Sequence, residues 1–183
     1  NFTSRKCSER RYCMINNVDF AVLSAAPKTL TEEEKSVLLY VVALIMRVSH
    51  TARRYGLLEV EPIIEELPTD TYYDRFAKKA IVLVVDGFEP EFFEELLDTE
   101  ILLTGVDSFE AYIYFIIKKG MLAVQSGETP YALRKRFVSC IPMCLREAAE
   151  EYIDTCENNI NELEKLSSSV LRDISSNWLR DES

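Results

Sequence analysis

Apolar residues recur at intervals of three and four positions along almost the whole chain from Thr31 onward, and this spacing constrains the fold more than any other feature. It matches the turn of an α-helix and gives each helix one apolar stripe. The first such segment opens with Thr31 and Glu34, which can satisfy each other's backbone donors as a capping box. The pattern predicts a helix that runs to about Tyr55, with Gly56 breaking or loosening it.

The same spacing, bounded by Gly and Pro residues, predicts further helices downstream. The β-branched run Ile81–Val85 also fits a buried strand, but the helical character of the residues before it favours a helix. Asp70 or Thr71 would cap that helix, and Asp107 or Ser108 would cap the one that ends at Gln125. The predicted helices cover residues 57–67, 72–85, 89–103, 109–125, 131–144, 145–166 and 170–179, and the two around Pro142 are either separate or one interrupted helix.

A chain of 183 residues is long enough for one domain with a substantial core. Residues 1–29 are polar and then mildly apolar, which predicts a loosely structured N-terminal arm with at most one short helix. Residues 30–183 predict a single all-α domain, packed as a bundle of about six to eight helices. No internal repeat of the solenoid period is apparent.

The charge balance excludes several classes of partner. With 31 acidic and 21 basic residues the net charge is −10, which disfavours nucleic acid and anionic lipid surfaces because both need a basic face. The longest apolar runs, Val37–Met46 and Ala80–Val85, fall short of the roughly 20 residues that span a bilayer. The start of the chain has no apolar run typical of a targeting segment. We therefore expect a cytoplasmic protein that does not span a membrane.

Signals for catalysis or metal binding are weak. His50 is the only histidine, and the five cysteines form no CxxC pair, so we expect no catalytic residue, metal or cofactor and no enzyme activity. Cys140 and Cys144 are predicted to share a helix face, as reduced thiols of the core. Asp86 with Gly87 predicts a helix C-cap and turn. A set of aromatic residues is predicted to be mostly core, with any exposed subset marking a protein-binding patch: Tyr72, Tyr73, Phe76, Phe88, Phe92, Phe93, Tyr112, Tyr114 and Phe115.

Two segments carry a family resemblance. The first, Leu44–Ile101, contains TARRYGLLEVEPIIEELP and then FAKKAIVLVVDGFEPEFFEELLDTEI. The second, Lys118–Pro142, reads KKGMLAVQSGETPYALRKRFVSCIP. In this order they resemble the water-exposed parts of the MotA-type flagellar stator subunit, which follow the second and the last membrane helices of that family.

The chain departs from that family where the membrane helices belong. Only Leu102–Ile117 lies between the two segments, too short for two membrane spans and carrying Asp107 and Glu110. Residues 1–28 cannot replace the first two family helices either. The resemblance therefore implies a protein that does not conduct ions, and since ring assembly in the family relies on membrane helices, a monomer or dimer.

The resemblance also points to partner-binding residues. Family stators present a basic and an acidic residue to the rotor switch protein, and alignment on Gly56 places these at Arg53 and Glu61, with Arg54 and Glu59 beside them. Exposed opposite charges suit a transient contact because they steer encounter. The partner would be the rotor switch protein or a stator. The same four charges are equally consistent with a solvated face of two helices, in a structural or regulatory protein unrelated to motility.

Overall fold

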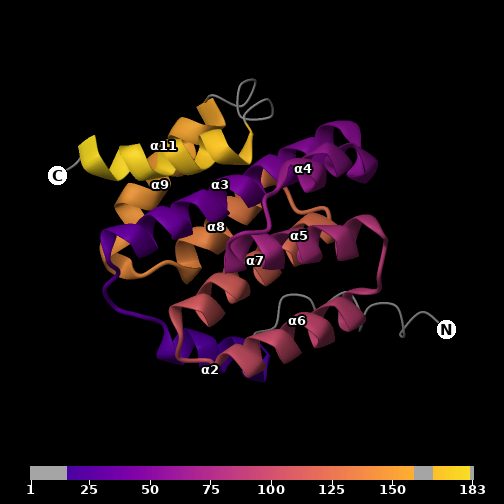
Figure 1. Ribbon diagram of the computed structural model, residues 1–183, viewed down its shortest axis with the longest axis horizontal. Helices are drawn as coiled ribbons and strands as arrows, with labels where there is room; N and C mark the ends of the chain where they lie inside the picture. Colours follow the sequence, from indigo (N-terminus) through magenta and orange to yellow (C-terminus); the bar gives the residue numbers. More distant parts are fainter. Residues whose placement is uncertain (1–15, 159–166, 182–183) are drawn as a thin grey trace.

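The computed structural model describes residues 16–158 and 167–181 of the chain, and within them it forms an all-α bundle without strands (Figure 1). The predicted fold class is confirmed. The described part holds nine α-helices, eight in or near the ranges predicted above and one within the predicted arm. They are α2 (Asn17–Ala25), α3 (Glu32–Tyr55), α4 (Glu61–Glu66), α5 (Tyr72–Val85), α6 (Pro90–Thr104), α7 (Phe109–Gln125), α8 (Pro130–Cys140), α9 (Arg146–Asn158) and α11 (Ser168–Asp181), with 3-10 turns η2 (Leu57–Val60) and η3 (Met143–Leu145).

Three helices, α3, α5 and α7, form the centre of the bundle, and each starts at a side-chain cap. Thr31 and Glu34 form the predicted capping box, while Thr71 and Ser108 accept a hydrogen bond from a backbone N–H of the first turn. The most buried of the three is α7, whose residues 111–124 are all buried. A helix that is covered on every side must lie in the core, which explains its nearly continuous apolar sequence.

The three central helices run in the same direction. Glu33 of α3, Tyr72 of α5 and Phe109 of α7 line one recess at their N-terminal ends. At the opposite end the Gln125 side chain, the last residue of α7, donates a hydrogen bond of 2.6 Å to the carbonyl of Phe88, just after α5. We call these two ends of the molecule the amino end and the carboxyl end of the bundle.

A tandem repeat of 40 residues underlies the two hairpins α5–α6 and α7–α8, contrary to our expectation of no repeat. Residues 76–100 and 116–140 match in secondary structure and, from residues 83 and 123 onward, almost entirely in burial. Both hairpins turn at a glycine with positive φ, Gly87 or Gly127, and restart at a proline three residues later. The identical pairs are Lys78 and Lys118, Lys79 and Lys119, Val84 and Val124, Gly87 and Gly127, Pro90 and Pro130, and Ile101 and Ile141.

The connections break where glycine and proline require it. The predicted helix over 57–67 is instead a 3-10 turn followed by the short α4, because Gly56 has φ 104° and Pro62 has no N–H to donate to the preceding turn. The chain also breaks at Pro142, so Cys140 and Cys144 lie on different elements rather than on one helix face. Neither is a core thiol, since Cys140 is half-buried and Cys144 is exposed.

Within the predicted arm, α2 packs against α6 and α7 through buried ion pairs. Asp19 is fully buried, and its carboxylate forms ion pairs with Lys118, at 2.6 Å, and with Lys119. Lys118 also contacts Asp98 of α6, and Lys119 lies 4.0 Å from Glu94. Burial raises the pKa of Glu94, against the opposing fields of Lys119 and Lys118.

One helix of the described part, α3, is long and apolar enough to cross a membrane by length and composition. In the folded chain it lies at the centre of the bundle, with thirteen of its residues buried. A central core helix meets the same test, so this finding alone does not indicate a membrane span.

Candidate protein-binding surface

All four residues that the resemblance singled out are exposed at the carboxyl end of the bundle. Arg53 and Arg54 lie in the last turn of α3, Glu59 lies in η2, and Glu61 opens α4. The residues from Arg53 to Glu59 are exposed without interruption, and Glu61 follows after one buried position. The predicted charged residues therefore share one stretch of surface.

Arg53 connects this stretch to the second hairpin. Its Nη1 donates a hydrogen bond of 3.3 Å to the carbonyl of Gly127, in the turn between α7 and α8. Ser49, Ala52 and Leu57 line a hollow of about 220 Å³ together with the same turn. The two segments of the family resemblance, far apart in the sequence, thus meet at this end.

Exposed apolar side chains lie at the same end of the bundle as the two arginines. Tyr55 and Leu58 are 56% and 71% exposed, and the Arg54 guanidinium lies 5.4 Å from the centre of the Tyr55 ring. Phe88 and Phe92 are 39% and 44% exposed, and their rings stack with centroids 5.3 Å apart. Within the aromatic set that was predicted to be mostly core, these two phenylalanines are exposed. They form the exposed aromatic subset that would mark a binding patch.

The turns that hold Phe88 in place follow from local chemistry. In the first hairpin Phe88 donates its N–H to Leu83 and Gly87 donates to Val84, with Gly87 at φ 72°. This is a Schellman motif, which confirms the predicted C-cap and turn at Asp86 and Gly87. No atom lies within 4 Å of a Cβ built on Gly87, so glycine is needed there for its backbone conformation and not for space.

The second hairpin repeats this motif. Glu128 donates its N–H to Ala123, and Gly127 donates to Val124. Thr129 then caps α8 and Pro130 starts it, as predicted for a turn and new helix rather than a phosphate loop. The repeat thus places two equivalent turns side by side, joined by the Gln125 hydrogen bond to Phe88. We define the carboxyl-end surface by Arg53, Arg54, Tyr55, Leu57, Leu58, Glu59, Glu61, Phe88, Phe92 and Gly127.

The charges of this surface are of both signs. Three helices point their partly negative C-terminal ends here, which favours arginine at the end of α3. The acidic residues Glu59 and Glu61 lie beside the arginines, and Glu89 and Glu91 begin the neighbouring α6. Among the described residues no group of three His, Cys, Asp or Glu side chains could hold a metal ion, and His50 lies half-buried within α3.

Comparison of the chain with protein-family models, with curated proteins and with solved structures finds no match. The family resemblance therefore rests on the residues quoted above, and the surface is interpreted from its own chemistry.

Proposed function

We propose that this chain is a soluble, non-conducting, MotA-like module that binds another protein through its carboxyl-end surface. The partner we infer is a component of the flagellar motor, either the rotor switch protein or a stator. One observation supports this most: Arg53, Arg54 and Glu61 lie exposed on the same end of the bundle as the stacked pair Phe88 and Phe92.

The composition of the surface supports protein binding. Aromatic side chains and arginine are the residue types that contribute most binding energy at protein interfaces. Tyr55 and Phe92 supply apolar area, while the exposed charges of Arg53 and Glu61 steer the encounter without a large gain in affinity. Such a surface suits a reversible contact.

We propose that the chain does not conduct ions because of the residues that join the two segments of the family resemblance. Residues 102–117 form the end of α6, a short turn and the first half of α7. The α7 part is buried in the core of the bundle, where it packs against α3, α5 and α6. The chain thus has a core helix at the place where the family has its channel.

Binding to purified rotor switch protein and to a purified stator would test the proposal. Arg53→Glu and Glu61→Lys should each lower the association rate about tenfold at low salt and less at high salt, because steering is screened. Phe92→Ala should raise the dissociation rate roughly fivefold or more, because it removes an apolar anchor. Association and dissociation rates, measured with an immobilised partner at two salt concentrations, separate the two effects.

Two controls match these changes. Arg75→Glu reverses an exposed charge at the amino end, and Leu103→Ala removes an apolar side chain that is 84% exposed near the far end of α6. Both should leave the rates unchanged. The proposal is overturned if the native chain binds neither protein, or if the controls weaken binding as much as the carboxyl-end variants do.

A further inference from the structure

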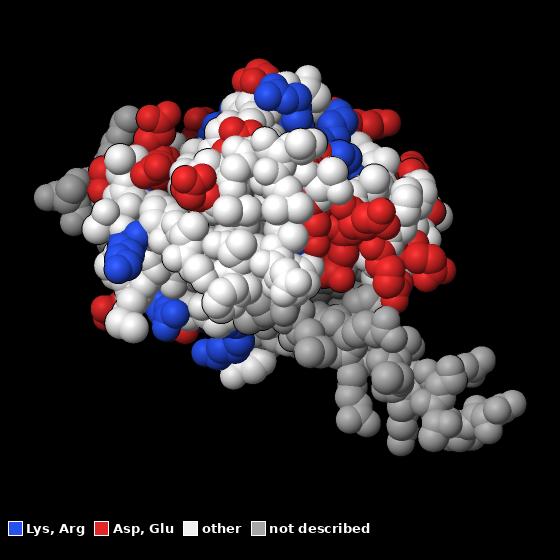
Figure 2. Space-filling model, turned by 90° about the horizontal axis from the view of Figure 1, so that it is seen from below, with Lys and Arg blue, Asp and Glu red and all other residues white. Residues whose placement is uncertain are grey.

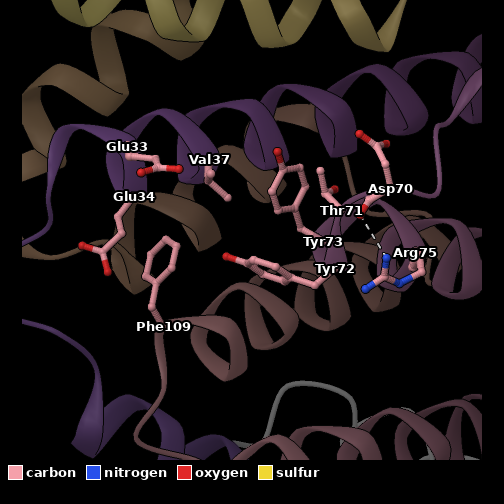
Figure 3. Close-up of a pocket in the computed structure, with 9 residues that line it drawn as sticks. All are labelled: Glu33, Glu34, Val37, Asp70, Thr71, Tyr72, Tyr73, Arg75 and Phe109. Carbon is pink, nitrogen blue, oxygen red and sulfur yellow. Dashed lines mark hydrogen bonds between the residues drawn. The ribbon is translucent and has the colours of Figure 1, made fainter.

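A second hollow lies at the amino end of the bundle, away from the carboxyl-end surface. It has a volume of about 500 Å³ and is bounded by the starts of α3, α5 and α7 (Figure 3). This size falls in the range of sites for small ligands or single side chains. We call it the amino-end recess; its lining residues are Glu33, Glu34, Val37, Asp70, Thr71, Tyr72, Tyr73, Arg75 and Phe109.

Aromatic rings form two walls of the amino-end recess. Figure 3 shows the Phe109 ring beside Glu34, with Tyr72 extending toward it from α5. The Tyr72 ring is held edge-on by Tyr73, with centroids 5.1 Å apart, and lies 6.1 Å from the ring of Tyr114. These contacts hold the Tyr72 ring in place before any ligand arrives, and the Phe109 ring lies 6.3 Å from that of Tyr112. The faces of aromatic rings carry partial negative charge and attract cations.

Carboxylates give the recess a negative field. Glu33 and Glu34 lie at its α3 side and Asp70 at its α5 side. The pKa of Tyr72 is raised, first by burial and then by the negative charges of Glu110, Glu34 and Glu33. The ring that points into the hollow therefore experiences a negative potential from more than one side.

Two features oppose this field. Arg75 lines the recess, but its guanidinium already donates to the carbonyls of Thr69 and Asp70, at 3.0 and 3.1 Å. The helix starts add partial positive charge, which on its own would favour an anion. Three carboxylates line the recess, Glu33, Glu34 and Asp70, and Glu110 adds a fourth negative charge that acts on Tyr72. Together they exceed the single charge of Arg75 plus the three helix ends, which carry about half a charge each.

We propose that the amino-end recess binds an organic cation, an alkylammonium or guanidinium group seated against Tyr72 and Phe109 and neutralised by Glu33. Such a group occurs both as a Lys or Arg side chain of a protein and as a free polyamine. The recess is independent of the carboxyl-end surface, so this inference goes beyond the proposed function and does not depend on it.

Titration followed by NMR of the Tyr72 and Phe109 ring resonances tests the proposal. The probes are tetramethylammonium, capped lysine and arginine amides, spermidine and, as an anion, acetate. We expect saturable shifts with the cations in the millimolar range or tighter. The capped amides will bind more tightly than spermidine if a protein side chain is the natural ligand, and less tightly if it is a free polyamine.

Matched variants identify the groups responsible. Glu33→Gln should weaken the cation at least threefold, whereas Glu32→Gln removes a charge from the same helical turn outside the recess and should change nothing. Tyr72→Phe should keep binding and Tyr72→Leu should lose it. If circular dichroism shows that Tyr72→Leu does not fold, the comparison of Glu33→Gln with Glu32→Gln still tests the proposal. Lack of saturable cation binding, preference for acetate, or equal effects of Glu33→Gln and Glu32→Gln would overturn the proposal.

Discussion

At the scale of single residues, Gly120 shows how closely the central helices approach. It is helical, and a Cβ at this position would lie 2.7 Å from Ile45 Cγ2 and 2.9 Å from Phe137 Cζ. Its counterpart in the first hairpin of the repeat is Ala80, which is fully buried. The two repeats therefore differ at this position because α7, unlike α5, lies between α3 and α8.

Gly120→Ala should destabilise the fold although alanine is the better helix former by about 1 kcal/mol. The new methyl group must displace Ile45 or Phe137, and such overpacking costs about 1–3 kcal/mol. Urea unfolding would measure the change in free energy. The reciprocal change Ala80→Gly should also destabilise, through lost helix propensity and a small void, and a Gly120→Ala variant more stable than the native chain would contradict the packing described here.

At the scale of the elements, a buried ionic cluster joins α2 to α7. Asp19 lies between Lys118 and Lys119, and all three side chains are buried or nearly so. Removing one partner of a buried ion pair costs about 3–5 kcal/mol, because it leaves a buried charge uncompensated. Because α2 is short, we expect it to detach from the bundle when one partner of the cluster is removed.

Asp19→Asn should therefore release α2 from α6 and α7 with little change elsewhere. Hydrogen exchange over residues 17–25 should become much faster, while exchange in α3 and α5 stays slow. Glu94→Gln is the matched control in the same cluster, since Glu94 is only partly buried and lies 4.0 Å from Lys119. Unchanged protection of α2 in Asp19→Asn would show that its other contacts, apolar packing and the hydrogen bond from Asn16 to Asp98, are enough to hold it.

The elements also show which parts of the fold the sequence could predict. Helix starts and ends were predictable where neighbouring residues determine them, as in the capping box of Thr31 with Glu34 and the turn at Gly87. The docking of α2 was not, because its contacts join residues about 80 to 100 positions apart. The 40-residue repeat did leave a signal, the matched Lys-Lys, Gly and Pro positions, which we missed.

The candidate surface was predictable only in part. Charged residues are expected at the surface, so the exposure of Arg53 and Glu61 could be predicted. It fits both a partner-binding pair and an ordinary solvated face of two helices. The exposure of Phe88 and Phe92 could not, because it depends on which helices pack over α6. The recess at Tyr72 likewise arises only when three separate helix starts come together.

At the scale of the whole molecule, negative charge is spread unevenly. Seen from the side formed by α2 and α6, one broad group of acidic residues lies at the right, and other acidic residues are scattered at the left (Figure 2). The sequence of α6, Pro90–Thr104, contains five acidic residues and no basic one. With a net charge of −10, mutual repulsion destabilises the compact state.

Added salt should therefore stabilise the fold. Screening of the repulsion between 0.05 and 0.5 M NaCl should add about 1 kcal/mol, which corresponds to roughly 2–4 °C in Tm. Thermal unfolding followed by circular dichroism measures this shift. The effect should vanish near the isoelectric point of 4.7, where the net charge is close to zero. A fall in Tm with salt at pH 7 would mean that exposed ion pairs outweigh the repulsion.

The single helix α3 has a consequence for how the molecule would behave under load. It reaches from Glu33 at the recess to Arg53 at the carboxyl-end surface without a break, a distance of roughly 30 Å at 1.5 Å per residue. Ile45 of α3 packs so closely against Gly120 of α7 that no room for a methyl group remains between the two helices. Two molecules bound at the opposite ends of α3 would therefore be held at a fixed distance and angle. A force applied to one of them would be transmitted through α3 to the other.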